Sequence, residues 1–128
     1  MAVSVIAAAR AVLVAALPGV NVSYKIPEPL TQRFIRISRA GGPRGRDIDS
    51  PRIIVECYAS TAAKAADGPR AELDAYAAAD ALRVAASGGP WAGGWITGWE
   101  QNNILDFPDP SQTQHARWQF TGTLYLLT

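Results

Sequence analysis

The final segment of the sequence alternates apolar and polar residues, and this alternation constrains the fold more than any other feature. Residues 117–127 read RWQFTGTLYLL, after the turn-forming residues DFPDPSQTQ at 106–114. Successive side chains of a β-strand point to opposite faces of its sheet. One face therefore carries Trp118, Phe120, Leu124 and Leu126, and the other carries Arg117, Gln119, Thr121, Thr123 and Tyr125. We predict a strand with one buried face and one face that meets solvent or another molecule.

The length and charge of the chain indicate one domain without a general affinity for polyanions. A chain of 128 residues can bury a hydrophobic core by itself, so we expect a single domain over residues 1–128. Its 12 Lys and Arg residues nearly balance its 11 Asp and Glu residues, so overall charge attracts it neither to nucleic acid nor to an acidic membrane. The single cysteine excludes an internal disulfide and is typical of folding in a reducing cytoplasm.

Residues 2–17 are almost wholly apolar, which is compatible with a packed helix, a signal peptide or a membrane span. The run is short for a span and carries Arg10 in its middle. We favour a packed helix over about Val5 to Leu17, with Ser4 as its N-cap and Pro18-Gly19 as its stop. Its apolar residues cover most of the circumference, which leaves a second apolar face for a neighbouring subunit.

Three strands and one long loop are predicted after this helix. Residues 20–24 form an edge strand at best, because two prolines follow closely. Residues 32–39 and 52–59 are longer strands, the second rich in β-branched and aromatic residues. Between them, residues 40–51 hold three glycines and two prolines, with only Ile48 to pack them down. We interpret this segment as a long hairpin loop that is mobile in isolation, with Arg44, Arg46, Asp47 and Asp49 as its charged residues.

A second helix is predicted from about Pro69 to Ser87, because proline suits the first turn of a helix and Gly88-Gly89 a stop. Its apolar stripe is expected to lie on the sheet and consists of Leu73, Tyr76, Ala77, Ala81 and Val84. A further strand over residues 94–107 and the final strand complete the order. Helix, strands, helix and strands with hairpin-length links favour an α+β fold: one mainly antiparallel β-sheet with two helices packed on one face.

Few residues of the chain have the chemistry of a catalytic or metal site. Cys57 and His115 are the only residues of their kinds and offer a hypothetical nucleophile and base. We favour a buried, inert Cys57, since it lies in an apolar strand. Asp47 and Asp49 have no third ligand nearby, which favours turn formation over cation binding, and no phosphate loop or zinc spacing is present. We therefore expect no enzyme activity, no cofactor and no metal.

The four tryptophans offer an alternative function. Trp91, Trp95 and Trp99 lie close together in the sequence, so a small module that binds a ligand or a peptide with its Trp-rich C-terminal half is a second hypothesis. Trp95 and Trp99 are four residues apart in a presumed strand and are expected to share a face. We favour core or interface packing for these side chains and for Trp118.

Two segments and the order of elements resemble a known family. Residues 51–66 read PRIIVECYASTAAKAA, a strand that ends in Cys, Tyr and Ala before the second helix. Residues 106–127 carry a Pro-Asp turn, then Arg with an aromatic residue, then a long final strand. Together with the order of helices and strands over nearly the whole chain, these features are similar to the tail terminator, or tail completion, proteins of long-tailed bacteriophages.

The resemblance implies a structural role in the virion. Proteins of this family form hexameric rings at the head-proximal end of the tail tube, end its polymerisation and dock the head-completion (connector) protein. The partners implied are copies of the chain itself, the major tail tube protein and the connector protein, while DNA passes through the ring without sequence-specific binding and no membrane is involved. Loop 40–51 is then expected to contact the tube or an adjacent subunit. Candidates for the subunit interface are Arg10, Val12, Leu13, Arg117 and Gln119.

Overall fold

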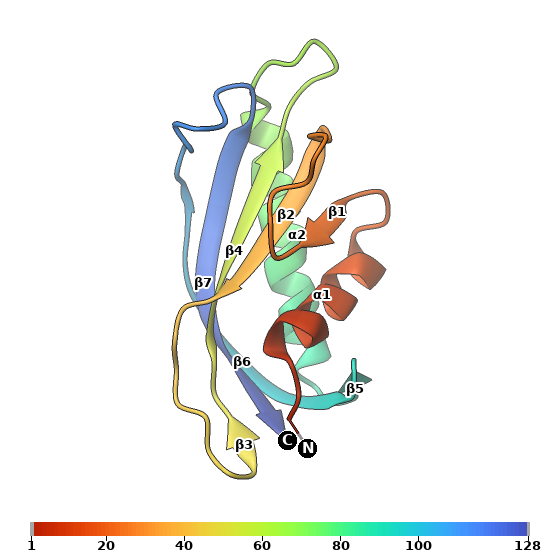
Figure 1. Cartoon of the computed structure of the whole chain (residues 1–128), viewed down its shortest axis with the longest axis vertical. Helices are drawn as coiled ribbons and strands as arrows, with labels where there is room; N and C mark the ends of the chain where they lie inside the picture. The colour runs from red at the N-terminus through yellow and green to blue at the C-terminus, as the bar shows by residue number, and fades with distance from the viewer. Residues whose placement is uncertain (1, 128) are drawn as a thin grey trace.

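The computed structural model describes residues 2–127, so the first and last residues of the predicted 1–128 domain lie outside the described residues. Two helices and seven strands alternate along the chain (Figure 1). The helices are α1 (Val5–Ala16) and α2 (Gly68–Ala85). The strands are β1 (Asn21–Ser23), β2 (Arg33–Arg39), β3 (Ile48–Asp49), β4 (Arg52–Ala59), β5 (Pro90–Trp91), β6 (Gly94–Asp106) and β7 (Ala116–Leu127).

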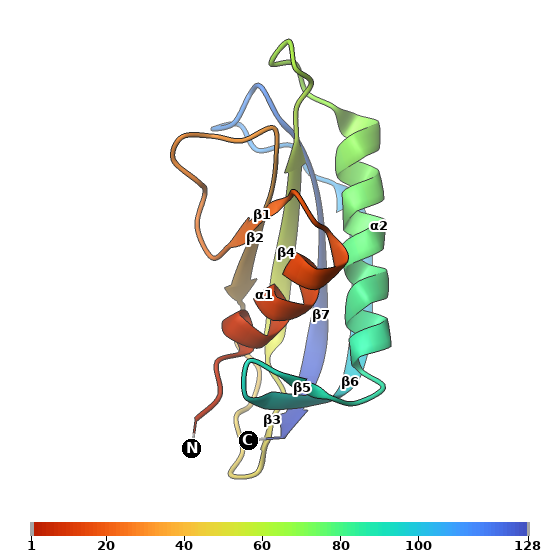
Figure 2. The same cartoon turned by 90° about the vertical axis from the view of Figure 1, so that its right-hand side faces the viewer.

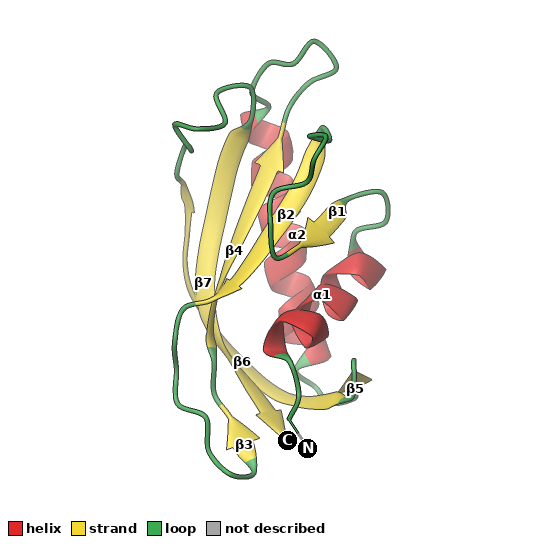
Figure 3. Ribbon diagram, in the orientation of Figure 1, coloured by secondary structure: helices red, strands yellow, loops and turns green. Residues whose placement is uncertain are grey.

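The strands form one sheet with the order β1-β2-β4-β7-β6-β5, and β3 pairs with the end of β7 (Figure 3). β1 runs parallel to β2, and the other pairs described are antiparallel. The predicted edge position of β1 is confirmed. The final strand, β7, lies between β4 and β6 near the middle of the sheet. Local alternation identifies a strand but does not reveal its partners.

The core joins both helices to the strands in one hydrophobic cluster. Its members include Leu13 of α1, Leu82 of α2, Ile37 of β2, Val55 of β4 and Phe120 of β7. α2 runs alongside β4 and β7, and α1 packs against α2, β1 and β2 (Figure 2). The α+β class, with one sheet and two helices, is confirmed. The placement of both helices on a single face of the sheet stays a prediction.

The first helix is packed as expected. The Ser4 hydroxyl accepts a hydrogen bond from the backbone N–H of Ala7 at 3.1 Å, which caps an otherwise unsatisfied donor at the start of α1. The helix ends at Ala16, one residue before the predicted end, and Leu17 closes it with a bond to the Leu13 carbonyl. Its buried side chains are Val5, Ala8, Ala9, Val12 and Leu13.

The second helix forms as predicted but turns a different face to the sheet. Asp67 caps its N-terminus, and Pro69 lies in its first turn. Its buried residues are Ala71, Asp74, Ala75, Ala78, Ala79, Leu82 and Ala85. Of the predicted apolar stripe, Ala77 and Ala81 are half-buried against the core, but the three large side chains are not, and for them the prediction is wrong. Leu73, Tyr76 and Val84 of that stripe are instead 52%, 41% and 67% exposed.

Two interactions explain this orientation of α2. The buried face of α2 consists mainly of alanines, and these small side chains let the helix approach the sheet closely. Alanine is only weakly hydrophobic, so an alanine face gives a weaker amphipathic signal than a face with large apolar side chains. The buried Asp74 accepts hydrogen bonds from Arg33 of β2 at 2.8 and 3.0 Å and from Arg70 at 3.0 Å. A carboxylate that is hydrogen-bonded to two guanidinium groups can be buried against the sheet. A prediction from hydrophobic spacing places every aspartate on the exposed face and therefore misses this arrangement.

Strand β6 carries irregularities that the sequence pattern did not reveal. Its register against β7 shifts between Ile96 and Gly98 and again between Gln101 and Ile104. The extra residue of the first bulge reverses the alternation of faces, so Trp99 pairs with Leu124 on the core side while Trp95 is 47% exposed and lies on the opposite face. The prediction that Trp95 and Trp99 share a face is therefore wrong.

Loop 40–51 is more ordered than predicted, because β3 anchors it. Ile48 and Asp49 pair with Leu127 and Leu126 of β7. Ser50 N–H donates to the Pro43 carbonyl at 2.9 Å. Ile48 is 50% exposed, and the buried Asp49 holds the loop instead.

Candidate functional site

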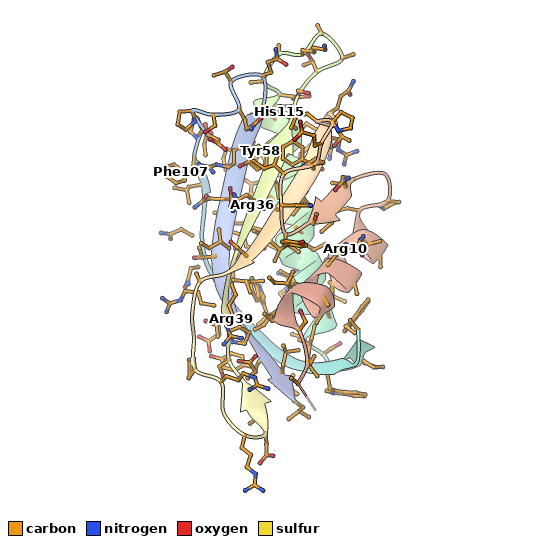
Figure 4. All side chains as sticks on the ribbon, viewed as in Figure 1. Arg10, Arg36, Arg39, Tyr58, Phe107 and His115 are labelled. Atoms are coloured by element: carbon orange, nitrogen blue, oxygen red, sulfur yellow. The ribbon has the colours of Figure 1, made fainter. Side chains whose placement is uncertain are left out.

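The sheet presents one face whose side chains alternate with those of the core. We call it the polar sheet face and define it by the half-buried residues Arg36, Ile54, Gln119, Thr121, Thr123 and Tyr125. Figure 4 shows this face toward the viewer, with Arg36 on β2 at its margin. α2 packs against β4, β6 and β7 from the core side, so the polar sheet face looks away from α2.

A polar cluster lies at one end of this face, where β4 and β7 meet the segment 107–115. Tyr58 OH lies 3.0 Å from Glu56 Oε2 and 2.9 Å from Asp109 Oδ2. Arg117 donates from Nη1 to Glu56 at 2.8 Å and from Nε to the Phe107 carbonyl at 2.6 Å. Arg117 also lies over the Phe107 ring, with its Cζ 4.8 Å from the ring centroid. These contacts tie the segment after β6 to the sheet.

The electrostatics of the cluster follow from its burial and its hydrogen bonds. Burial, the hydrogen bond to Asp109 and the charge of Glu56 raise the pKa of Tyr58, which keeps its hydroxyl a donor. Burial alone would raise the pKa of Asp109, but bonds from Ser111 and Tyr58 and the charge of Arg117 outweigh it and lower that pKa below its ordinary 3.8. Asp109 therefore acts as an acceptor, and Tyr58 and Arg117 act as donors.

Sequence reasoning did not identify this cluster. The sequence signal for this cluster was the pair of polar residues Glu56 and Tyr58 on a mainly apolar strand. In the sheet they pair with Gln119 and Arg117 of β7. Asp109 belongs to a turn, and its position near Tyr58 depends on the folded path of the chain.

His115 and Cys57 lie on opposite faces of the sheet and form no catalytic pair. The His115 ring packs edge-on against Phe34, whose ring stacks on Tyr58 at a centroid distance of 4.4 Å. Its Nε2 lies 2.9 Å from the Thr31 carbonyl. Cys57 is fully buried in the core cluster, and burial raises the pKa of its thiol far above the ordinary value, so it is a packed thiol as expected.

The four charged residues of loop 40–51 do not act as one group. Arg44, Arg46 and Asp47 are exposed. Asp49 is only 1% exposed and accepts two hydrogen bonds from Arg39, at 2.8 and 3.0 Å. Its inclusion in an interaction loop is therefore wrong, because its carboxylate already holds the base of the hairpin.

Some of the predicted interface residues lie at the surface of the subunit, and others lie in its interior. Val12 and Leu13 are 3% and 0% exposed within the subunit, so they offer no contact surface. Arg10 is exposed and donates to the Val22 carbonyl at 2.9 Å. Arg117 is engaged in the polar cluster, and Gln119 is half-buried on the polar sheet face. The large apolar side chain that α1 exposes is Val14, at 42%.

The largest exposed apolar side chains of either helix lie on α2. We call Leu73, Tyr76, Asp80 and Val84 the outer stripe, since they follow one another at helical spacing on the exposed side of α2. One margin of the stripe still touches the sheet, where the Tyr76 ring lies edge-on to Trp118 of β7 at a centroid distance of 6.2 Å. Asp80 lies at its middle and pairs with Arg83 at 3.1 Å, with both side chains largely exposed.

The tryptophans do not converge on a common pocket. Trp91 lines an apolar hollow of about 220 Å³ with Val12, Ala81 and Val84. Trp95 and Trp99 lie on opposite faces of the sheet. A separate groove of about 460 Å³ lies among the loops near His115 and Lys64, and no tryptophan lines it.

Within residues 2–127, His, Cys, Asp and Glu side chains form no group of three that could hold a metal ion. Neither described helix is long and apolar enough to cross a membrane. The sequence matches no protein-family model and no curated protein.

Proposed function

We propose that this chain is a structural subunit of a bacteriophage virion, which assembles into a ring on the head-proximal end of the tail tube. In this role it ends tube polymerisation and provides the docking surface for the connector protein. The resemblance of residues 51–66 and 106–127 to the tail terminator family supports the proposal. Six subunits is the number that this resemblance implies.

The outer stripe of α2 is the observation that carries this proposal. It exposes Leu73, Tyr76 and Val84 to 52%, 41% and 67% on a helix whose opposite face is packed. Contiguous exposed apolar surface is typical of interaction sites, whereas apolar side chains exposed singly are normal on a monomer. The stripe and the polar sheet face lie on opposite sides of the subunit and differ in chemistry, as the head-to-tail contacts of a ring require.

Loop 40–51 is the part of the subunit best placed to contact the tube. Its hairpin projects from one end of the molecule, and the 107–115 segment lies at the other end (Figure 1). Its tip carries the exposed residues Arg44, Arg46 and Asp47, while Asp49 and β3 hold its base against the body. A charged tip on a fixed base suits docking to a partner with little loss of conformational freedom.

The alternative function, a binding module built on the Trp-rich half, has weaker geometric support. Its Trp95 and Trp99 side chains lie on opposite faces, so they do not converge on one ligand.

The proposed function can be tested by adding the purified chain to polymerising tail tube protein from the same phage. We expect shorter tubes with ring-shaped density at one end, visible by electron microscopy. Arg44→Glu should weaken this capping because it reverses a charge at the exposed loop tip, whereas Thr113→Glu, in the exposed loop at the other end, should not. Tubes of unchanged length with bare ends would contradict the proposal.

A further inference from the structure

We infer that the polar sheet face of one subunit receives the outer stripe of α2 from a neighbouring copy of this chain. The inference rests on the proposed function in one respect, namely that copies of the chain assemble. It adds which two surfaces meet and which charges pair between them.

Arg36 is the first reason to expect a partner on the polar sheet face. Its side chain forms no ion pair with any described residue, and its Nε is buried without a hydrogen-bond partner. Glu56 is its cross-strand neighbour on β4, but that carboxylate already accepts from Arg117 and lies against Tyr58. The buried Nε is closed to a docking partner, but the terminal guanidinium nitrogens of Arg36 are neither buried nor hydrogen-bonded to a described residue. A carboxylate from a neighbouring copy can therefore form a charge-assisted pair with them.

The outer stripe supplies a carboxylate of this kind. Asp80 lies between the apolar side chains of Leu73 and Tyr76 on one side and Val84 on the other. Its ion pair with Arg83 is at the surface, where the side chains are 64% and 71% exposed. Exposed ion pairs contribute little to stability, so Asp80 can leave Arg83 and pair with the less exposed guanidinium of Arg36 at a small cost in free energy.

The two surfaces also agree in size and in apolar content. α2 has 18 residues and is therefore about 27 Å long. β4 has eight residues and spans about 27 Å, beside the longer β7. The polar sheet face offers the half-buried Ile54 and Tyr125 and, at its margin, Leu105 and Phe107, which are 41% and 49% exposed. A helix laid along these strands would cover apolar side chains of both partners.

A second unpaired cation supports the choice of this face. Arg52 is exposed in the first position of β4, in register with Thr123, and its side chain forms no ion pair with the residues described. The sheet face also carries Glu56 and Glu100, but Glu56 is held by Arg117, and Glu100 accepts from the Tyr125 hydroxyl. The guanidinium groups of Arg36 and Arg52 are thus the charges that it offers to a partner. The stripe offers Asp80 and, beside it, Glu72. This charge complementarity favours a face-to-stripe contact over a contact between two stripes or between two faces.

The test uses variants that each lose one surface. Arg36→Glu reverses the charge of the sheet face, and Val84→Glu places a charge in the stripe at a position that is 67% exposed. Each variant alone should sediment as a monomer, with a dissociation constant raised at least about tenfold over that of the unaltered chain. An equimolar mixture should form a one-to-one dimer and nothing larger, because each variant keeps one intact surface. Thr113→Glu, outside both surfaces, should assemble normally.

The outcomes separate this inference from the alternatives. Dimers of Arg36→Glu alone would indicate stripe-to-stripe contact, and dimers of Val84→Glu alone would indicate face-to-face contact; either overturns the inference. Because the carboxylate introduced by Arg36→Glu would lie beside Glu56, circular dichroism must confirm folding, and Thr121→Arg provides a second block of the sheet face. The exchange Arg36→Asp with Asp80→Arg in one chain should restore assembly.

Failure of the inference and failure of the proposed function remain distinguishable. If the unaltered chain caps tubes as rings but all three surface variants assemble equally well, the inference is wrong and the function stands. If the unaltered chain stays monomeric at all concentrations, the inference is again wrong, and tube capping decides the function separately.

Discussion

At the scale of single residues, Gly122 is a position that depends on its lack of a side chain. It lies on the core face of β7, where Trp99 of the neighbouring strand covers it. A Cβ at this position would come within 2.2 Å of Trp99 Cη2 and 2.7 Å of the Glu100 carbonyl oxygen. The indole of Trp99 also packs edge-on against Phe120, at a centroid distance of 6.0 Å, so it cannot move freely toward the core.

Gly122→Ala is therefore expected to destabilise the fold. The added methyl group forces the indole or the strand to shift, and overpacking of this kind costs about 1–3 kcal/mol of unfolding free energy. Thermal denaturation measures the change. Gly68→Ala is the matched control, because a Cβ there meets nothing within 4 Å, and it should leave stability unchanged or slightly raised. Equal stability of the two variants would show that Trp99 does not occupy the space above Gly122.

The roles of single residues were predictable where the local sequence pattern determines them. The buried state of Cys57 and the capping role of Ser4 followed from an apolar strand and a helix start. The roles of Asp49 and Asp74 were not predictable, because each buried carboxylate forms an ion pair with an arginine of another segment. Sequence spacing does not show which distant cation a carboxylate meets.

At the scale of elements, segment 107–115 is held to the sheet by charge-assisted bonds. Asp109 faces Tyr58 of β4 and Arg117 of β7, and it accepts a bond from Ser111 N–H within its own turn. Together these groups lower the pKa of Asp109 against the opposing effect of burial. A carboxylate with a lowered pKa stabilises the fold above its unfolded pKa, and this contribution is lost as pH falls through the folded value.

Asp109→Asn should therefore change the response to acid. At neutral pH the variant should have a lower melting temperature than the unaltered chain. The difference should shrink as pH falls below the ordinary value of 3.8, because the wild-type carboxyl group then takes up its proton. Melting temperatures between about pH 7 and pH 2 measure this. Asp106→Asn removes an exposed carboxylate outside the cluster and should follow the unaltered chain. A gap for Asp109→Asn that stays constant with pH would exclude the ionic explanation.

The elements themselves were largely predictable, and their faces were predictable where large side chains alternate. β7 buries Phe120, Leu124 and Leu126 as expected, since a strand has only two faces. α2 was placed with the wrong face inward, because alanines and Asp74 make its packed side less hydrophobic than its exposed one. The bulge after Ile96 reversed the expected face of Trp95, and one inserted residue leaves no mark in composition.

At the scale of the whole molecule, one core links parts of the chain that are far apart in sequence. Both helices and strands β2, β4, β6 and β7 contribute to the same hydrophobic cluster. A domain of this size with a single core is expected to unfold in one cooperative step. The α+β class was predictable from element order, whereas the central position of β7 was not, because strand pairing depends on contacts across the chain.

Cooperative unfolding can be followed with two independent signals. Far-ultraviolet circular dichroism reports mainly the helices, while tryptophan fluorescence reports residues 91–118, where all four tryptophans lie. The two denaturation curves should coincide. Leu13→Ala in α1 removes a fully buried side chain and should shift both curves equally, at a cost of about 2–5 kcal/mol. A tryptophan curve that stays unmoved would reveal two independently folding parts.

The central position of β7 has a consequence for the chain before it has folded. Strands β1, β2 and β4 are synthesised first and β5 and β6 later, yet among the described strands only β7, which follows them all, pairs with both groups. Until β7 pairs, the chain therefore holds two partial sheets, each with the edge that awaits β7 unpaired, and such edges attract other chains. Conditions that delay the pairing of β7 should therefore favour aggregation over native protein.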